Sequence, residues 1–336
     1  MNQPSVVGTT LDVQSFINAQ PLSRYQWRVV ILCFLIVFLD GLDTAAMGFI
    51  APALSQDWGI DRASLGPVMS AALIGMVFGA LGSGPLADRF GRKVVLVGAV
   101  LVFGAFSLAS AYSSNVDQLL VLRFLTGLGL GAGMPNATTL LSEYTPERHK
   151  SLLVTSMFCG FNLGMAGGGF ISAKLIPAFG WHSLLLIGGI LPLILTVVLW
   201  GWLPESARYL VVRNRGTDKV RKALSPIEPG IVAQASSFSV PEQTTVKARN
   251  VFAVIFSGTY SAGTLLLWLT YFMGLVIVYL LTSWLPTLMR DSGASMEQAA
   301  FIGALFQFGG VLSAVGVGWA MDRFNPHKVI DRKSVV

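Results

Sequence analysis

The feature that most constrains the fold of this chain is an internal repeat at a fixed offset. The sequence GPLADRFGRK at 84–93 returns as GWAMDRFNPHK at 318–328. The offset of 234 residues between Asp88 and Asp322 also aligns Pro52 with Pro286 without a gap. An apolar run precedes each copy, so two long hydrophobic helices lead into equivalent charged loops. Soluble solenoids repeat at much shorter periods, so the repeat predicts a membrane protein built from two related halves.

Composition supports a membrane environment. The chain is 53% hydrophobic and 12% charged, and its mean hydropathy is +0.66. Its apolar runs are about 20 residues long, which is the length a helix needs to cross a bilayer. We therefore predict an all-α, polytopic membrane protein. The eight predicted spans are 28–53, 64–86, 94–112, 118–141, 151–173, 182–203, 262–288 and 298–320.

The basic residues predict how the chain is oriented in the membrane. Most of them lie in the amino-terminal arm and in the even-numbered gaps between spans, whereas the odd-numbered gaps hold only Arg62, Lys174 and Arg290. The positive-inside rule then places the amino terminus and the long middle loop in the cytoplasm. The net charge of +6 is explained by this topology and by anionic lipid, so we expect a lipid bilayer and no nucleic acid as partner.

The spacing of the spans divides the chain into five regions. We expect a cytoplasmic arm at 1–27, a six-helix bundle at 28–203 and a cytoplasmic loop at 204–250. The loop mixes prolines with basic residues, which favours short amphipathic helices joined by flexible segments. The second bundle, at 251–330, contains two spans, and a short tail follows at 331–336.

Three ionisable residues lie inside the predicted spans. Asp40 and Asp43 are three residues apart and share a helix face. Asp40 follows Arg28 by about 18 Å of helix, which is near the membrane midplane, where a carboxylate costs about 2.5–3.5 kcal/mol. Burial and mutual repulsion favour a neutral acid, so the pair can bind and release a proton; capping of a helix break at Gly41 is the alternative. Arg123 can pair with either aspartate or with the carboxylate of a substrate.

Four motifs resemble the Major Facilitator Superfamily, in particular its aromatic acid:proton symporters. They are DGLDT at 40–44, the loop at 84–93, RFLTG at 123–127 and PESAR at 204–208. The resemblance implies two six-helix bundles, twelve spans in all, with a midplane site between them. It implies uptake of an aromatic carboxylate such as 4-hydroxybenzoate or protocatechuate with a proton, by a monomer in the bacterial inner membrane. The proton gradient drives such transport, and no cofactor or metal is expected.

The resemblance also assigns roles to the repeated loops. Their charged residues are expected to latch the two bundles and to gate their rocking motion. Glu143, with Arg148 nearby, resembles a charge pair of the family, although a solvated surface pair is also possible. Asn162 is a candidate contact for a ring hydroxyl, or else a helix-to-helix hydrogen bond. The residues of the predicted gate are Gly84, Asp88, Arg89, Arg92, Asp322 and Arg323.

The chain differs from the family pattern after the second loop motif. Eight of the expected twelve spans are present, and residues 331–336 read DRKSVV. These six residues can be encoded by the start of a common sequencing adapter, so we expect them to be non-native and the sequence to be truncated. Since alternating access needs two complete bundles, we expect the 336-residue chain itself not to transport.

Other functions stay open at this stage. A membrane enzyme would need a nucleophile with its base, or metal ligands, at membrane depth, and the spans show no such set; the three histidines lie at span edges without metal-ligand spacing. A sensor that binds aromatic acids without moving them would share every motif. A facilitator for another organic anion or a sugar-like solute is a further alternative. Uptake of labelled substrate into proteoliposomes separates these possibilities.

Overall fold

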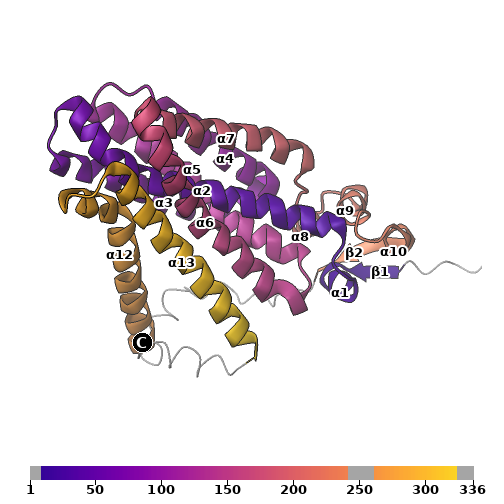
Figure 1. Cartoon of the computed structure of the whole chain (residues 1–336). Coiled ribbons are helices and arrows are strands. Elements are labelled where there is room, and N and C mark those ends of the chain that lie inside the picture. The colour runs from indigo at the N-terminus through magenta and orange to yellow at the C-terminus, as the bar shows by residue number, and fades with distance from the viewer. Residues whose placement is uncertain (1–8, 241–260, 324–336) are drawn as a thin grey trace, which may run out of the picture.

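The eight predicted spans coincide with long helices of the structure, a computed structural model that describes residues 9–240 and 261–323, apart from residues 64–65, 111–112 and 203, which lie just beyond a long helix (Figure 1). The helices exceed the predicted spans by several residues at most ends, because polar residues extend them beyond the apolar runs. Their bounds are α2 Arg24–Trp58, α3 Gly66–Phe90, α4 Arg92–Ser110, α5 Val116–Tyr144, α6 Glu147–Phe179, α7 His182–Trp202, α12 Ser261–Asp291 and α13 Met296–Arg323. A short 3-10 helix, η1, covers Arg62–Leu65.

Seven helices among the described residues are long and apolar enough to cross a membrane. They are α2 to α7 and the part of α12 from Ser261 to Thr282. The eighth predicted span falls in α13, where several side chains lie outside the described part of the chain. The fold is therefore all-α and polytopic, as the sequence predicts, and the eighth span stays a prediction.

The first membrane helix begins and ends with strong local signals. Ser23 and Gln26 form a capping box: the Ser23 side chain accepts from the Gln26 amide, and the Gln26 side chain accepts from the Ser23 amide. The Gln26 side chain also donates to the Tyr144 carbonyl oxygen at 2.7 Å, which joins the start of α2 to the end of α5. At the other end, Gly59 adopts a left-handed conformation with φ of 62°.

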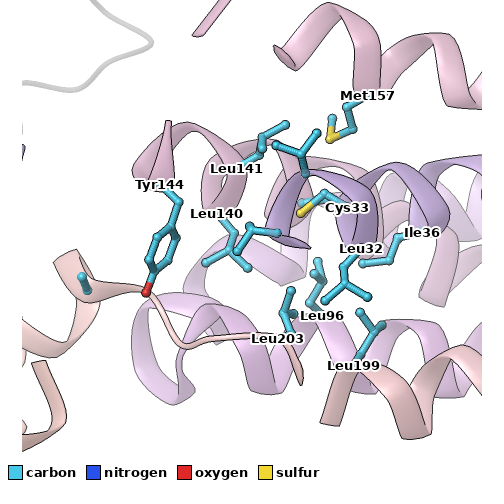
Figure 2. Packing of buried hydrophobic residues seen from close by; sticks show 14 of the residues in the cluster. Leu32, Cys33, Ile36, Leu96, Leu140, Leu141, Tyr144, Met157, Leu199 and Leu203 are labelled. Atoms are coloured by element: carbon cyan, nitrogen blue, oxygen red, sulfur yellow. The ribbon is translucent and has the colours of Figure 1, made fainter. Parts of the chain in front are cut away.

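The helices of the first bundle pack through small residues and aliphatic side chains. A Cβ added at Gly164 would overlap the Phe38 carbonyl between α6 and α2, and one at Gly127 would overlap the Ala72 carbonyl between α5 and α3. Such contacts require glycine, because they bring two backbones together. Figure 2 shows the aliphatic part of the core, where Leu32 and Cys33 of α2 meet side chains of α4, α5, α6 and α7.

A small domain covers the end of the first bundle at which α2 begins. It contains β1 (Thr9–Asp12), α1 (Val13–Ala19), α8 (Ala207–Val212), α9 (Thr217–Leu224), α10 (Pro229–Gln234) and β2 (Ala235–Ser239). The short helices agree with the prediction for 204–250. The parallel pairing of β1 with β2 was not predicted, since it joins segments more than 200 residues apart, and Thr10 lies opposite Ser237.

The helices α12 and α13 lie beside the first bundle (Figure 1). The helix α13 packs along α6, and α12 contacts α2 and α13. Side chains from Leu265 to Val278 in α12 are all exposed. The segment 251–260, the remainder of the predicted second bundle at 324–330 and the predicted non-native tail at 331–336 lie outside the described residues.

Candidate functional site

The three ionisable residues predicted within the spans are all buried in the first bundle. Asp40 and Asp43 lie one turn apart on α2, and each is 2% exposed. Arg123 lies on α5 and is 0% exposed. The structure brings Asp43 and Arg123 together, with 3.1 Å between Asp43 Oδ2 and Arg123 Nη1.

Two serines of α4 extend this ion pair into a network. Ser107 Oγ donates to Asp43 Oδ1 at 2.6 Å. Arg123 Nε donates to Ser110 Oγ at 3.3 Å, and Ser110 Oγ donates in turn to the Phe106 carbonyl oxygen. A buried ion pair needs such additional hydrogen bonds to offset the cost of removing both charges from water. The network therefore ties α2, α4 and α5 together at one level of the bundle.

The two aspartates have different surroundings. Asp43 bonds to Arg123 and Ser107, so both of its oxygens have a donor. Among the described residues, Asp40 accepts from Thr44 Oγ1, at 3.3 Å, and no cation there forms an ion pair with it. An ionised carboxylate without a cationic partner is costly to bury, so the neutral acid suits the surroundings of Asp40 better.

A cavity of about 30 Å³ adjoins the ion pair. Asp43, Thr44 and Arg123 line it together with Tyr279 of α12, so the second part of the chain reaches the site. Arg123 Nη2 is buried and has no hydrogen-bond partner among the described residues. A cavity that binds benzene has a volume of roughly 150 Å³. The cavity is therefore smaller than the space that an aromatic ring occupies.

The first repeated loop forms a second polar cluster, at the membrane end where α8 lies. Gly91 separates α3 from α4 with φ of 105°. Arg92 pairs with Asp88, with 3.3 Å between Nη2 and Oδ1. Two further side chains bond to the same loop. Tyr209 of α8 donates from Oη to the Arg89 carbonyl oxygen, and Arg213, which follows α8, donates from Nε to the Asp88 carbonyl oxygen.

The remaining predicted gate residues are only partly described. Gly84 lies inside α3, where an added Cβ would meet no atom within 4 Å. Asp322 and Arg323 are the last two residues of α13, and their side chains lie outside the described part of the chain. Contacts between the two repeated loops thus stay a prediction.

Glu143 and Arg148, which were expected to form a charge pair, form no ion pair among the described residues. Arg148 instead donates to the carbonyl oxygens of Asn18 and Gln20, and so holds the amino-terminal arm against the start of α6. Glu143 lies near Ser206, Arg92 and Arg208. It lines a cavity of about 590 Å³ that also contains Asp88 and Arg92. The pairing fails because α5 ends at Tyr144, and α6 starts a new helix that turns Arg148 toward the arm.

Asn162 faces the second part of the chain. Its amide nitrogen lies 4.0 Å from the position that a Cβ on Gly310 of α13 would occupy. Asn162 lies at this helix interface and does not line the cavity beside the ion pair.

Sequence reasoning missed three polar residues of the site, namely Ser107, Ser110 and Tyr279. The two serines carried a signal, because they are polar residues three positions apart in an otherwise apolar span. Tyr279 carried none, since aromatic residues are common along membrane helices. No group of three or more His, Cys, Asp or Glu within the described ranges could hold a metal ion.

Long apolar helices that enclose a buried ion pair define an integral membrane protein with a polar site inside its bundle. Residues 33–330 match the model of the Major Facilitator Superfamily. The chain belongs to this superfamily.

Several relatives are similar over nearly the whole chain. The 4-hydroxybenzoate transporter PcaK of Pseudomonas putida is 88% identical over 331 residues, which are 98% of this chain and 74% of the relative. The protein of the same name from Acinetobacter baylyi is 65% identical, over 96% of this chain and 71% of the relative. The gallate transporter of Pseudomonas putida is 53% identical, over 96% of this chain and 72% of the relative.

Solved structures support the fold. A partially occluded, inward-open structure of the xylose transporter XylE from E. coli superposes with a TM-score of 0.67 at 19% identity, over 90% of this chain and 74% of that one. A bacterial homologue of the human lysosomal transporter Spinster gives a TM-score of 0.69 at 18% identity, over 91% of this chain and 64% of that one. At these identities the likeness concerns the fold alone.

Proposed function

We propose that this protein takes up an aromatic carboxylate, such as 4-hydroxybenzoate or protocatechuate, together with a proton. The observation that carries the proposal is the 88% identity over 98% of the chain with a protein named as a 4-hydroxybenzoate transporter. The gallate transporter, at 53% identity, carries another hydroxylated aromatic acid by its name. The common chemistry is a benzoate ring with a carboxylate and at least one hydroxyl.

The buried polar network supplies groups suited to this chemistry. Arg123 has one nitrogen without a partner among the described residues, and that nitrogen is available to a substrate carboxylate. Tyr279 and Thr44 line the same cavity and can bond a ring hydroxyl once it opens. In this proposal Asp43 holds Arg123 in position, and Asp40 binds and releases the proton because no cation of the described residues pairs with it.

The loop at 84–93 acts as a gate in the same proposal. Its residues Asp88, Arg89 and Arg92 bond to each other or to α8, so the loop and α8 move as one unit. Asp322 and Arg323 take the equivalent place in the second half. Breaking the contacts of both loops would let the two halves rock and expose the site to alternate sides of the membrane.

The location and organisation of the protein follow from the same reasoning. We place it in the bacterial inner membrane as a monomer, with a cytoplasmic amino terminus. In this proposal the six-helix bundle at 28–203 encloses the ion pair, and the incomplete second bundle at 251–330 contributes Tyr279 to the adjoining cavity. The loop at 204–250 joins the two. The proton gradient supplies the driving force, so the protein is a transporter without enzymatic activity and without a cofactor.

Uptake of radiolabelled 4-hydroxybenzoate tests this function. The protein, expressed from its own genomic locus and reconstituted in proteoliposomes, should accumulate substrate against a gradient when the outside is made acidic. An ionophore that collapses the proton gradient should abolish accumulation. The substitution Asp40→Asn should remove proton-driven accumulation while substrate exchange persists, because an amide cannot carry the proton.

The matched control is Asp117→Asn, which removes an exposed carboxylate from the first turn of α5. It should accumulate substrate as the unchanged protein does. Binding of 4-hydroxybenzoate without any uptake would indicate a sensor and reject the transport proposal. Full proton-driven accumulation by Asp40→Asn would reject the role of Asp40 and leave transport intact.

A further inference from the structure

A basic pocket lies where the amino-terminal end of α2 meets α9. It has a volume of about 460 Å³ and is separate from the ion-pair cavity and from the cavity beside Asp88. Four of its lining side chains are cationic: Arg28 of α2, Lys93 of α4, and Lys219 and Lys222 of α9. Lys93 ends the proposed gate loop at 84–93, and the transport proposal gives no role to the other three.

The pocket has more positive than negative charge. Glu205 is the single acidic residue among its lining residues, and its Oε1 already accepts from the backbone amides of Lys93 and Ser206, at 3.1 and 2.9 Å. None of the four cationic side chains forms an ion pair with a described residue. Lys93 is attracted by the Glu205 carboxylate and repelled, less strongly, by Lys222. An anion placed between these side chains would relieve the repulsion.

The edge of the pocket is aromatic and apolar. Arg28 lies over the ring of Tyr25, 4.8 Å from its centroid, so its guanidinium is held at the mouth. Trp202, the last residue of α7, lines the pocket and is largely exposed. Exposed apolar side chains lie on the same stripe of α7 as Gly201, which lines the pocket, namely Val197 and Ile194, and Val94 of α4 is exposed next to Lys93. Tryptophan and basic residues at helix ends are typical of the boundary between headgroups and hydrocarbon.

We propose that this pocket binds the headgroup of an anionic phospholipid. The phosphate lies among the four cations, and the acyl chains follow the exposed apolar surface of α4 and α7. A free phosphate would match the charges and would gain nothing from Trp202 or from that apolar surface. Basic pockets between membrane helices on the cytoplasmic side hold such headgroups in other membrane proteins. The proposal does not depend on which solute the protein carries.

A lipid bound in this pocket would also hold α9, which belongs to the loop between the two bundles, against the first bundle. Lys219 and Lys222 belong to the loop between the two bundles, whereas Arg28 and Lys93 belong to spans of the first bundle. A headgroup held by all four would therefore fasten α9 to the membrane surface.

Native mass spectrometry of the whole protein, released from vesicles of stated composition, tests the proposal. From vesicles of phosphatidylglycerol and phosphatidylcholine, the protein should retain phosphatidylglycerol selectively. The double variant Lys219→Gln/Lys222→Gln should weaken this binding roughly 30-fold, which corresponds to about 1 kcal/mol for each lysine. Both residues are exposed on α9, so the variant should still fold.

The matched control is Arg24→Gln/Lys150→Gln, which removes the same charge from residues at the same end of the bundle that do not line the pocket. It should keep its affinity for phosphatidylglycerol. Equal weakening in both double variants would mean general attraction to a positive surface and would overturn the proposal. Displacement of the lipid by millimolar inorganic phosphate would overturn it as well, since the pocket would then be a free-phosphate site.

Discussion

The helices α2 and α12 have equally apolar sequences and opposite surroundings. The most apolar window of each has a mean hydropathy of 2.2, yet 72% of that window is buried in α2 and 0% in α12. The two helices are neighbours at the site, since Asp43 of α2 and Tyr279 of α12 line the same cavity. Hydropathy therefore predicts that both cross a membrane and says nothing of which one forms a core.

Small residues and polar pairs account for the difference. In the first bundle, glycines of α2, α3, α5 and α6 bring backbones into contact, and a buried ion pair joins α2 to α5 while hydrogen bonds of Ser107 and Ser110 add α4. In α12, a Cβ added at Gly263 or Gly274 would meet no atom within 4 Å. The helix is joined to α13 by a buried hydrogen bond from Gln307 Nε2 to Thr282 Oγ1, at 2.7 Å. Packing in lipid depends on such close contacts, because lipid tails solvate apolar side chains as well as other helices do.

Removing the charge of Arg123 tests the first bundle most severely. The substitution Arg123→Gln should abolish uptake and lower the free energy of unfolding by about 3–5 kcal/mol, because Asp43 is left buried without its cation. Thermal unfolding in detergent measures the second effect. The double variant Asp43→Asn/Arg123→Gln should recover much of the stability and none of the uptake. If the single and double variants were equally unstable, the ion pair would not be what holds α2 to α5.

Glycine substitutions compare the two regions directly. Gly164→Ala should lower the free energy of unfolding by about 1–3 kcal/mol, because its Cβ would overlap the Phe38 carbonyl. Gly274→Ala in α12 should be neutral or should stabilise by up to about 1 kcal/mol through helix propensity. Thermal unfolding of both variants in the same detergent gives the comparison. Equal losses would contradict the difference in packing between α6 and α12.

The smallest expected effect concerns the hydrogen bond between α12 and α13. Gln307→Leu should destabilise their contact by roughly 0.6 kcal/mol, the mean for hydrogen bonds between membrane helices. Adding Thr282→Val gives a double-mutant cycle that isolates the coupling energy. Thr270→Val is the control, since its hydroxyl bonds within α12 to the Leu266 carbonyl. A coupling energy near zero would mean that the apolar contacts alone join these helices.

Several parts of the fold and the site were predictable from local sequence. Apolar runs predicted the eight long helices, whereas the alternative of a helix break at Gly41 is wrong, because α2 runs unbroken through Gly41, which packs against the Phe161 carbonyl of α6. Asp40, Asp43 and Arg123 were recognisable because charge is rare inside such runs. The sequence did not distinguish the two aspartates, which lie one turn apart on the same helix. Their difference depends on Ser107 and Arg123, which belong to other helices.

The parallel strands and the partner of Arg148 were not predictable for the same reason. The strand at Thr9–Asp12 pairs with one at Ala235–Ser239, and neither segment alternates strongly enough to be recognised alone. Arg148 was expected to pair with Glu143 from resemblance to a charge pair of the family, whereas it bonds to the amino-terminal arm. Both contacts join segments that are distant along the chain.

The sequence by itself determined that this protein is a membrane protein of the Major Facilitator Superfamily with charges inside its spans. Those properties depend on hydropathy, on the repeat and on local motifs, all of which can be recognised in the linear sequence. Only the tertiary structure decided that Asp43 holds Arg123 while Asp40 has no cationic partner in the part of the chain that the structure describes, and that basic residues of α2, α4 and α9 share one pocket. The physical reason is that burial and pairing are properties of neighbours in space, and helices distant in sequence supply those neighbours.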